Sequence, residues 1–399
     1  MVKKFPYSRQ QILRQDISAV NKVLKSNYLT QGPVVKEFEK KISKKVNVKY
    51  AVAVNSATSA LHIACLALGL KKNEFIWTVP TTFVASANCG VYCGAKIDFV
   101  DINEKIFNID INKLTQKLQS TKKKPKILVT VHLGGQPTEQ EKIWKLAKKY
   151  NFYVIEDASH SLGASRNKNF VGNCKWSDIT VFSFHPVKII TTGEGGMAVT
   201  NNKQIYEKLD ILKNHGITRN QLNLKRKKLG FWYYEQQFLG FNYRLSDISA
   251  ALGISQLKRL NKFILERNKI AKRYDLLLKN LPVKPQEIKK GNKSSFHLYI
   301  ILLELKKIKK SYNQIFTALR NKGIMINLHY LPVHLQPFYK KFGFKNGSFP
   351  VSENYAKQAI SLPIYPGLTK VEQIKIVKIL KKITSYIILV NLTQYIMSI

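Results

Sequence analysis

The stretch ITVFSFHPVKIITTGEGG, residues 179–196, decides the fold of this 399-residue chain. It begins with an apolar segment, Ile179 to Phe184, that is short enough to be a buried strand. A loop that contains Lys188 follows, and Gly193-Glu194-Gly195-Gly196 closes the stretch. Open α/β sheets keep their functional sites at the carboxyl ends of their strands. The stretch therefore predicts a sheet strand with Lys188 on the loop where a site forms.

A second predicted strand, Phe152 to Ile155, lies upstream and leads into Glu156-Asp157-Ala158-Ser159-His160. An acid and a lysine, each at the end of a buried strand, are the pair that pyridoxal phosphate needs. The lysine holds the cofactor aldehyde as a Schiff base, and the carboxylate faces the pyridinium nitrogen and supports the electron sink. Free lysine has a pKa near 10.4, so a nucleophilic lysine must be desolvated or lie beside a cation. We expect Lys188 and Asp157 to fill these two roles.

The segment 50–54 predicts a buried strand that runs directly into a helix from Ala57 to Leu68. This helix is apolar almost all round, which is typical of an interior helix. Ser56 is placed to cap it, and Thr58 and Ser59 add hydroxyls to its first turn. A helix N-terminus of this kind favours an anion, because free amides and the helix dipole both point at it. We expect a phosphate to bind there.

The rest of the chain alternates strands and helices, which implies a mainly parallel sheet covered on both faces. A basic, aromatic stretch from Arg219 to Phe238 interrupts the pattern and predicts a long loop or hairpin, and a long helix from Ser246 to about Leu278 follows. We expect a large cofactor-binding α/β domain with an N-terminal arm over residues 1–255 and a smaller α+β domain over 256–399. Further strands are predicted at 97–100, 126–131, 179–184, 197–199, 296–303 and 325–328, and further helices at 139–149, 312–322 and 371–383.

The chain has four cysteines and no visible targeting segment. Cys89 and Cys93 have three residues between them and no second pair nearby, so the spacing predicts no zinc site. Buried free thiols in a reducing, cytoplasmic compartment are the expected state. No signal peptide follows Met1, and the apolar tail from Ile387 to Ile399 is too short to span a bilayer. We therefore expect neither a metal nor a membrane as a partner, while the role of the tail stays open between packing on the smaller domain and contact with a membrane interface.

Four motifs together resemble one family. Residues 55–61 (NSATSAL), 156–163 (EDASHSLG), 183–196 and 240–245 (GFNYRL) are spaced as in the DegT/DnrJ/StrS nucleotide-sugar aminotransferases, and the similarity runs from about Tyr7 to about Ile383. The resemblance implies a fold-type I pyridoxal-phosphate-dependent transferase, with a seven-stranded sheet between helices. It also implies a homodimer with shared active sites.

Two segments narrow the resemblance. Tyr28-Leu29-Thr30-Gln31-Gly32 and Trp232-Tyr233-Tyr234-Glu235 are similar to the transaminases of pseudaminic acid biosynthesis. This implies transfer of an amino group from L-glutamate to C4 of a UDP-linked 4-keto-6-deoxy-N-acetylhexosamine. The exact sugar and its C5 configuration stay open, because loop side chains decide between epimers.

The resemblance also assigns roles at matching positions. Phe83 corresponds to the aromatic residue that stacks on the cofactor ring, and His160 to the residue that contacts its phenolic oxygen, where many relatives carry Gln. His185 is expected close to the Schiff base of Lys188, and a core position is an equal alternative for it. Leu331 departs from the basic residue that some relatives carry. The other expected cofactor contacts are Ala57, Thr58, Ser59, Ser183 and Asn242 of the partner subunit. The expected sugar-nucleotide contacts are Tyr7, Asn27, Tyr28, Leu29, Thr30, Ala57, His185, His329, Tyr330, Leu331 and Pro332.

The formal net charge of +42 raises the alternative of a nucleic-acid-binding protein. Only ten of the 66 basic residues are Arg, the residue that bidentate base and phosphate recognition favours, and the excess is spread along the chain. We therefore interpret the lysines as solvated surface, whose field attracts an anionic nucleotide sugar. The cause of the charge itself stays open.

Other functions are known for proteins that resemble this chain in the same way. An aminotransferase for another sugar nucleotide, of the GDP-perosamine or UDP-4-amino-4-deoxy-L-arabinose type, fits the same motifs. A sister class has His in place of the lysine and removes a sugar hydroxyl, and Lys188 argues against it. A cofactor-binding regulator is disfavoured, since no helix-turn-helix segment stands outside the catalytic framework.

Overall fold

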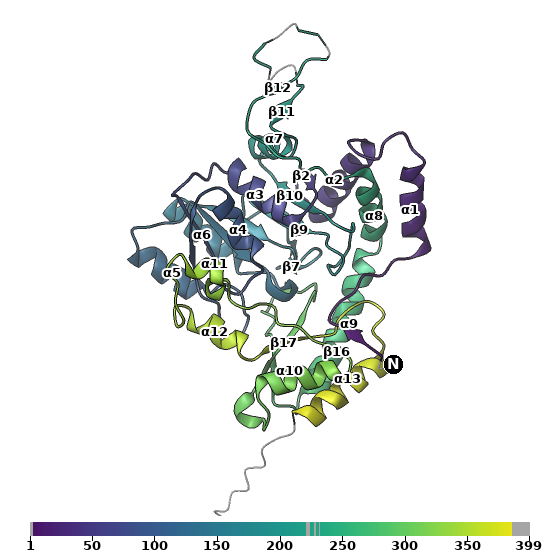
Figure 1. Cartoon of the computed structure of the whole chain (residues 1–399), viewed down its shortest axis with the longest axis vertical. Helices are drawn as coiled ribbons and strands as arrows, with labels where there is room; N and C mark the ends of the chain where they lie inside the picture. The colour runs from purple at the N-terminus through teal and green to yellow at the C-terminus, as the bar shows by residue number, and fades with distance from the viewer. Residues whose placement is uncertain (1–2, 221–223, 227–228, 231, 385–399) are drawn as a thin grey trace, which may run out of the picture.

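A seven-stranded sheet forms the centre of the computed structural model, which describes residues 3–220, 224–226, 229–230 and 232–384 (Figure 1). The apolar tail from Ile387 to Ile399 lies outside these residues. The strand order is β2-β10-β9-β6-β5-β3-β4, and among these seven strands β10 runs in the direction opposite to the other six. This confirms the mainly parallel sheet. The strands are β2 Tyr50–Val54, β3 Phe75–Thr78, β4 Lys96–Phe99, β5 Ile127–Val131, β6 Tyr153–Asp157, β9 Ile179–Ser183 and β10 Gly196–Thr200.

The register of the central strands brings their carboxyl ends to one edge. Asp157 at the end of β6 lies opposite Val131 of β5 and Val181 of β9. Because these three strands are parallel, the segments that follow them emerge side by side. The loop after β9, which carries Lys188, therefore begins next to Asp157.

Helices cover both faces of the sheet (Figure 1). Alternate side chains of β2 point to opposite faces of the sheet. Val52 and Val54 pack in one apolar cluster with α3, and Ala51 and Ala53 pack in another cluster with α2. The parallel strands are buried on both faces, which explains their nearly continuous apolar sequences. The helices around the sheet are α1 Arg14–Leu24, α2 Pro33–Val46, α3 Ala57–Ala67, α4 Ala85–Tyr92, α5 Ile111–Ser120, α6 Gln140–Tyr150, α7 Lys203–Leu212 and α8 Asp247–Leu257.

The C-terminal part has its own core around a three-stranded antiparallel sheet, β13-β15-β17. The N-terminal arm crosses to this part, because β1 (Phe5–Pro6) pairs in parallel with β16 (Ile324–Met325) and Phe5 is buried in its core. The main elements here are α9 Leu260–Leu278, β13 Val283–Pro285, β15 Tyr299–Leu303, α10 Tyr312–Asn321, α11 Pro337–Lys340, α12 Pro350–Ala356, β17 Ala359–Leu362 and α13 Lys370–Ile383.

Two short strands, β11 (Ile217–Thr218) and β12 (Glu235–Gln236), pair at the base of the basic, aromatic stretch, which projects from the body at the top of Figure 1. This confirms the predicted hairpin. Its described residues include large exposed apolar side chains, among them Trp232 (73% exposed) and Phe238 (50% exposed).

Several elements differ from the sequence prediction, and the strand expected over 325–328 is only β16, at Ile324–Met325. The single helix expected over 246–278 is divided into α8 and α9, which meet at Lys258 and Arg259. Arg259 leaves helical geometry there and forms an ion pair with Asp16 of α1, so a tertiary contact rather than Gly or Pro marks the break. Strand β3 was not predicted, since its four residues form an apolar run too short to recognise. Within the described residues, none of the helices has the length and apolar character needed to cross a bilayer.

Candidate active site

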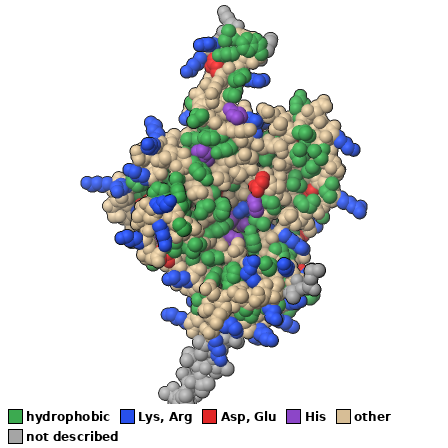
Figure 2. Space-filling model, in the orientation of Figure 1, with side chains coloured by type: hydrophobic (Ala, Val, Ile, Leu, Met, Phe, Trp, Pro, Cys, Tyr) green, Lys and Arg blue, Asp and Glu red, His purple; other side chains and the backbone are tan. Residues whose placement is uncertain are grey.

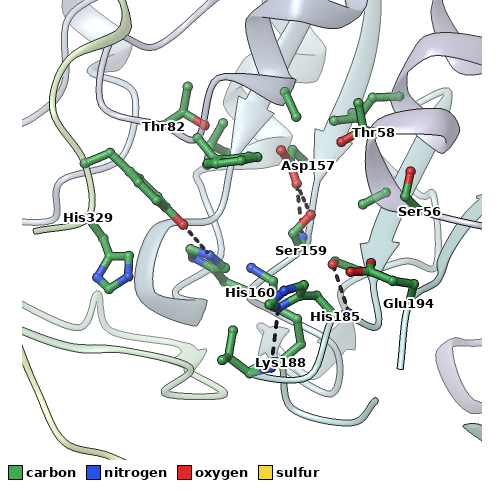
Figure 3. Close-up of a pocket in the computed structure, with 18 of the residues that line it drawn as sticks. Ser56, Thr58, Thr82, Asp157, Ser159, His160, His185, Lys188, Glu194 and His329 are labelled. Atoms are coloured by element: carbon green, nitrogen blue, oxygen red, sulfur yellow. Dashed lines mark hydrogen bonds between the residues drawn. The ribbon is translucent and has the colours of Figure 1, made fainter. Parts of the chain in front are cut away.

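A cavity of about 450 Å³ opens at the carboxyl edge of the sheet (Figure 3). Its walls come from the start of α3, the turn before α4, the ends of β5, β6 and β9, the N-terminal arm and residues 327–330. The structure thus brings together segments from almost the whole length of the chain. The sequence-predicted residues that line it are Tyr7, Ala57, Thr58, Phe83, Asp157, His160, Ser183, His185, Lys188, His329 and Tyr330.

Lys188 extends into this cavity from the loop after β9. Its backbone amide donates to the carbonyl of His185 (2.9 Å), which closes a turn. Burial lowers the pKa of Lys188 to about 8, although the negative charge of Asp157 opposes this change. At neutral pH a useful fraction of this amine is therefore uncharged and nucleophilic.

Asp157 is buried at the end of β6 and faces the same cavity. Ser86 Oγ donates to one carboxylate oxygen (2.6 Å), and the amide and hydroxyl of Ser159 donate to the other (3.1 and 2.6 Å). These three donors fix the orientation of the carboxylate and leave it capacity to accept another bond. Neither serine was predicted. Ser159 lies within the acidic motif and could have been found, whereas Ser86 is 71 residues away in sequence.

His160 is held by two neighbours. The amide of Gly134 donates to its Nδ1 (3.4 Å), so the neutral ring carries its proton on Nε2, which lies 3.1 Å from the hydroxyl of Tyr330. Burial, together with the charge of Lys188, holds the pKa of His160 well below its ordinary value. The ring is therefore an uncharged hydrogen-bonding group.

The first turn of α3 forms another wall of the cavity, with Ser56 and Thr58 (Figure 3). Ser56 caps the helix by accepting from the amide of Ser59 (3.1 Å), as predicted. The Ser59 hydroxyl donates to the side chain of Asn55 (2.7 Å), so Ser59 supports the turn while Ala57 and Thr58 line the cavity. At Gly196 an added Cβ would lie 2.4 Å from the backbone nitrogen of Ala57, so glycine lets β10 approach this helix end.

Several predicted site residues lie away from this cavity in the single chain. Asn242 is exposed and pairs with Asn214 in an isolated bridge. The predicted loop of four residues after α1 is exposed. Leu331 (46% exposed) and the buried Pro332 are not among the residues that line the cavity. That loop comprises Asn27, Tyr28, Leu29 and Thr30.

Other lining residues were missed by the sequence prediction. Glu194 sits in the glycine-rich segment after Lys188 and could have been noted from that position. Thr82, Val131 and Leu328 carry no local signal and reach the cavity only through the fold. The remaining unpredicted residues are Ser56, Leu61, Ala85, Ser159, Val187, Gly195 and Asn327.

The donor set fits pyridoxal phosphate. Lys188 offers an amine of lowered pKa, and Asp157 offers an oriented carboxylate for a pyridinium nitrogen. The amides of Ala57 and Thr58 in the first turn of α3 have no partner within the helix and can bind a phosphate. Phe83 is 56% exposed beside the cavity, where its ring can cover a planar ligand. An amine, a carboxylate, a phosphate-binding helix end and an aromatic ring are the groups that this cofactor requires.

Comparison with known proteins places this geometry in context. The model of the DegT/DnrJ/EryC1/StrS aminotransferase family matches residues 10–381. The UDP-4-amino-4,6-dideoxy-N-acetyl-beta-L-altrosamine transaminase of Campylobacter jejuni subsp. jejuni serotype O:23/36 (strain 81-176) is 40% identical over 360 residues, which are 90% of this chain and 92% of that protein.

Two solved structures share the whole architecture. Helicobacter pylori PseC, described as an aminotransferase involved in the biosynthesis of pseudoaminic acid, superposes with a TM-score of 0.87 and 32% identity, over 96% of this chain and 99% of its own. The putative sugar aminotransferase Spr1654 from Streptococcus pneumoniae, in its PMP-form, has a TM-score of 0.87 and 29% identity, over 95% and 98% of the two chains.

Proposed function

The chain belongs to the DegT/DnrJ/EryC1/StrS aminotransferase family, and from this premise we propose that it aminates C4 of a UDP-linked 4-keto-6-deoxy-N-acetylhexosamine, with pyridoxal phosphate as cofactor and L-glutamate as donor. The observation that carries the proposal is the pair of Lys188, with its lowered pKa, and the oriented Asp157 in one cavity. The 40% identity to a UDP-sugar transaminase and the likeness to an aminotransferase of pseudoaminic acid biosynthesis support the substrate.

Lys188 and Asp157 have different roles in the proposed reaction. Bound pyridoxal phosphate supplies an electron sink for the carbanion formed at the reacting carbon. Lys188 Nζ accepts the α-proton of the amino donor and, in the second half-reaction, delivers a proton to C4 of the sugar. Asp157, held by Ser86 and Ser159, keeps the ring nitrogen protonated through a charge-assisted hydrogen bond.

Binding groups flank these two residues. We assign the phosphate to the first turn of α3, with Thr58 and Ser183, and the stacking face to Phe83. Tyr7, His185, His329 and Tyr330 also line the cavity and are assigned to the sugar nucleotide. Lys and Arg side chains project around the face shown in Figure 2, and their positive charge attracts the anionic nucleotide.

We further propose that the active unit is a homodimer with shared sites. Asn242 is exposed and away from the cavity of its own chain, which suits a contribution to the partner's site. The projecting hairpin carries apolar side chains that a second copy would cover, and the loop from Asn27 to Thr30 is exposed in the same way. We also propose a cytoplasmic location, since the four cysteines are free thiols.

Reduction with borohydride tests the chemistry. The purified protein should be yellow, and borohydride should fix the cofactor covalently to Lys188, which peptide mass mapping identifies. Lys188→Ala should abolish turnover even where cofactor stays bound. An adduct on any other lysine would contradict the assignment.

A panel of sugar nucleotides tests the substrate. UDP-2-acetamido-2,6-dideoxy-β-L-arabino-hex-4-ulose should be aminated with the highest kcat/KM. If the D-xylo epimer or a GDP-linked keto sugar reacts about tenfold better, which corresponds to about 1.4 kcal/mol, the substrate proposal is wrong while the aminotransferase remains.

Mixing of two inactive variants tests the shared site. Lys188→Ala and Asn242→Ala protomers, once exchanged, should regain partial activity because each mixed dimer contains one intact site. Absence of recovery after confirmed subunit exchange would argue against it.

A further inference from the structure

Arg267 of α9 is buried behind the active site, with only 1% of its surface exposed. Its Nη1 donates to three backbone carbonyls of the C-terminal part, those of Phe296 (3.1 Å), His297 (3.2 Å) and Ile364 (2.9 Å). Its Nη2 donates to Ser8 Oγ of the N-terminal arm (3.3 Å). One guanidinium thus joins three segments that are distant in sequence.

This cation has no carboxylate partner among the residues that the structure describes. Burial lowers the pKa of Arg267 to about 9, and its Nε has no acceptor within the protein. Burying an unpaired charge is costly unless hydrogen bonds compensate it. Departures of this kind from the usual rules are expected at functional sites.

Ser8 carries the contact on to the catalytic loop. Its hydroxyl accepts from Arg267 and donates to the carbonyl of Val187 (2.9 Å). A charged donor polarises the hydroxyl and strengthens its own donated bond. The peptide unit between Val187 and Lys188 is therefore held on both sides, since its amide donates to His185.

The same guanidinium supports the wall behind His160. Phe296, whose carbonyl it binds, adopts a left-handed backbone with φ of 44°, which non-glycine residues rarely adopt. The ring of the next residue, His297, lies 4.4 Å from the ring of His160. Arg267 thus contacts the segment behind the histidine directly and reaches the loop that holds the lysine through Ser8.

We propose that Arg267, acting through Ser8, is a positioning residue that fixes the Val187–Lys188 peptide and so aims the Lys188 amine into the cavity. The inference rests on the proposed function only for the role of the lysine. The hydrogen-bonded chain from Arg267 through Ser8 to Val187 exists in the protein without any ligand.

Hydrogen exchange of the Lys188 amide tests this chain of contacts in full-length protein stripped of cofactor. Ser8→Ala should speed this exchange by about fivefold or more, the effect of losing one hydrogen bond that restrains local opening. Ser8→Thr keeps the hydroxyl and should restore slow exchange. Thr200→Val is the matched control, because it removes another buried hydroxyl that donates to a carbonyl (Asp178, 2.7 Å) at the far end of the sheet.

Kinetics of the cofactor-loaded variants give the second readout. Ser8→Ala should lower kcat while the KM for L-glutamate stays near that of the wild type, because the reacting amine is misplaced while the binding groups remain. The proposal is overturned if the Lys188 amide of Ser8→Ala exchanges less than about fivefold faster than that of the wild type. It is also overturned if Thr200→Val speeds the exchange of this amide as much as Ser8→Ala does. If borohydride fails to link the cofactor to Lys188 in the wild type, the proposed function fails, and exchange still decides the positioning role.

Discussion

Replacing Lys188 by Met should make the cofactor-free protein more stable at neutral pH, although it destroys the proposed activity. An ordinary lysine has a pKa of 10.5, and burial in the cavity lowers that of Lys188 to about 8. Below pH 8 the folded protein must hold a charged amine in an environment that disfavours it. Methionine has a similar length and no charge, so the variant avoids this cost.

The magnitude follows from the two pKa values. At about 1.4 kcal/mol per pKa unit, the interval from 10.5 to 8 corresponds to about 3 kcal/mol of unfolding free energy. Between pH 8 and 10.5 the unfolded chain binds more protons at this site than the folded chain, so wild-type stability rises with pH across that window. The advantage of Lys188→Met should therefore be about 3 kcal/mol at pH 7 and about 1 kcal/mol at pH 10.

Urea unfolding of both proteins at pH 7 and pH 10, after removal of cofactor, measures this difference. Lys44→Met serves as the control, because Lys44 is exposed in the last turn of α2. Its effect should stay within about 0.5 kcal/mol at both pH values. If Lys188→Met is no more stable than the wild type at pH 7, or if its advantage does not shrink at pH 10, the reasoning about this lysine is refuted.

Three further predictions concern other parts of the molecule. Glu156→Gln should destabilise the protein by about 3–5 kcal/mol, since it leaves buried Arg166 uncompensated. Although burial opposes its ionisation, the charge of Arg166 holds the pKa of Glu156 well below its ordinary value. In urea unfolding, the stability difference between the wild type and Glu156→Gln should thus be complete at pH values above the ordinary glutamate pKa and should shrink as pH falls below it. A stability difference that does not change with pH would contradict this. Gly196→Ala should weaken cofactor binding in a fluorescence titration and lower the free energy of unfolding by about 1–3 kcal/mol, because its Cβ would collide with the start of α3. Unchanged affinity for the cofactor would count against a phosphate site at this helix end. The KM for the sugar nucleotide should rise with salt in steady-state assays, since screening shortens to about 8 Å at physiological ionic strength; a KM independent of salt would exclude electrostatic attraction.

Local patterns in the sequence were sufficient to predict the sheet and to point to the two residues that we propose as catalytic. A strand buried on both faces needs a short, continuous apolar run, and such runs precede both Asp157 and Lys188. The capped start of α3 was predictable in the same way, because Ser56 bonds to an amide only three residues away. The four-residue strand β3 and the break at Arg259 were missed, since the first gives too short a pattern and the second depends on Asp16.

The sequence by itself determined which residues stand at the strand ends and the helix cap to which we assign the chemistry, because strand ends and helix caps depend on neighbouring positions. Only the tertiary structure decided how those residues are held. Ser86 reaches Asp157 across 71 positions, Ser8 reaches Val187 across 179, and Arg267 reaches Ser8 across 259. A hydrogen bond forms between atoms about 3 Å apart in space, whatever their separation along the chain. No periodicity or spacing encodes such pairs, so they appear only once the packing of helices on the sheet has fixed where each segment lies.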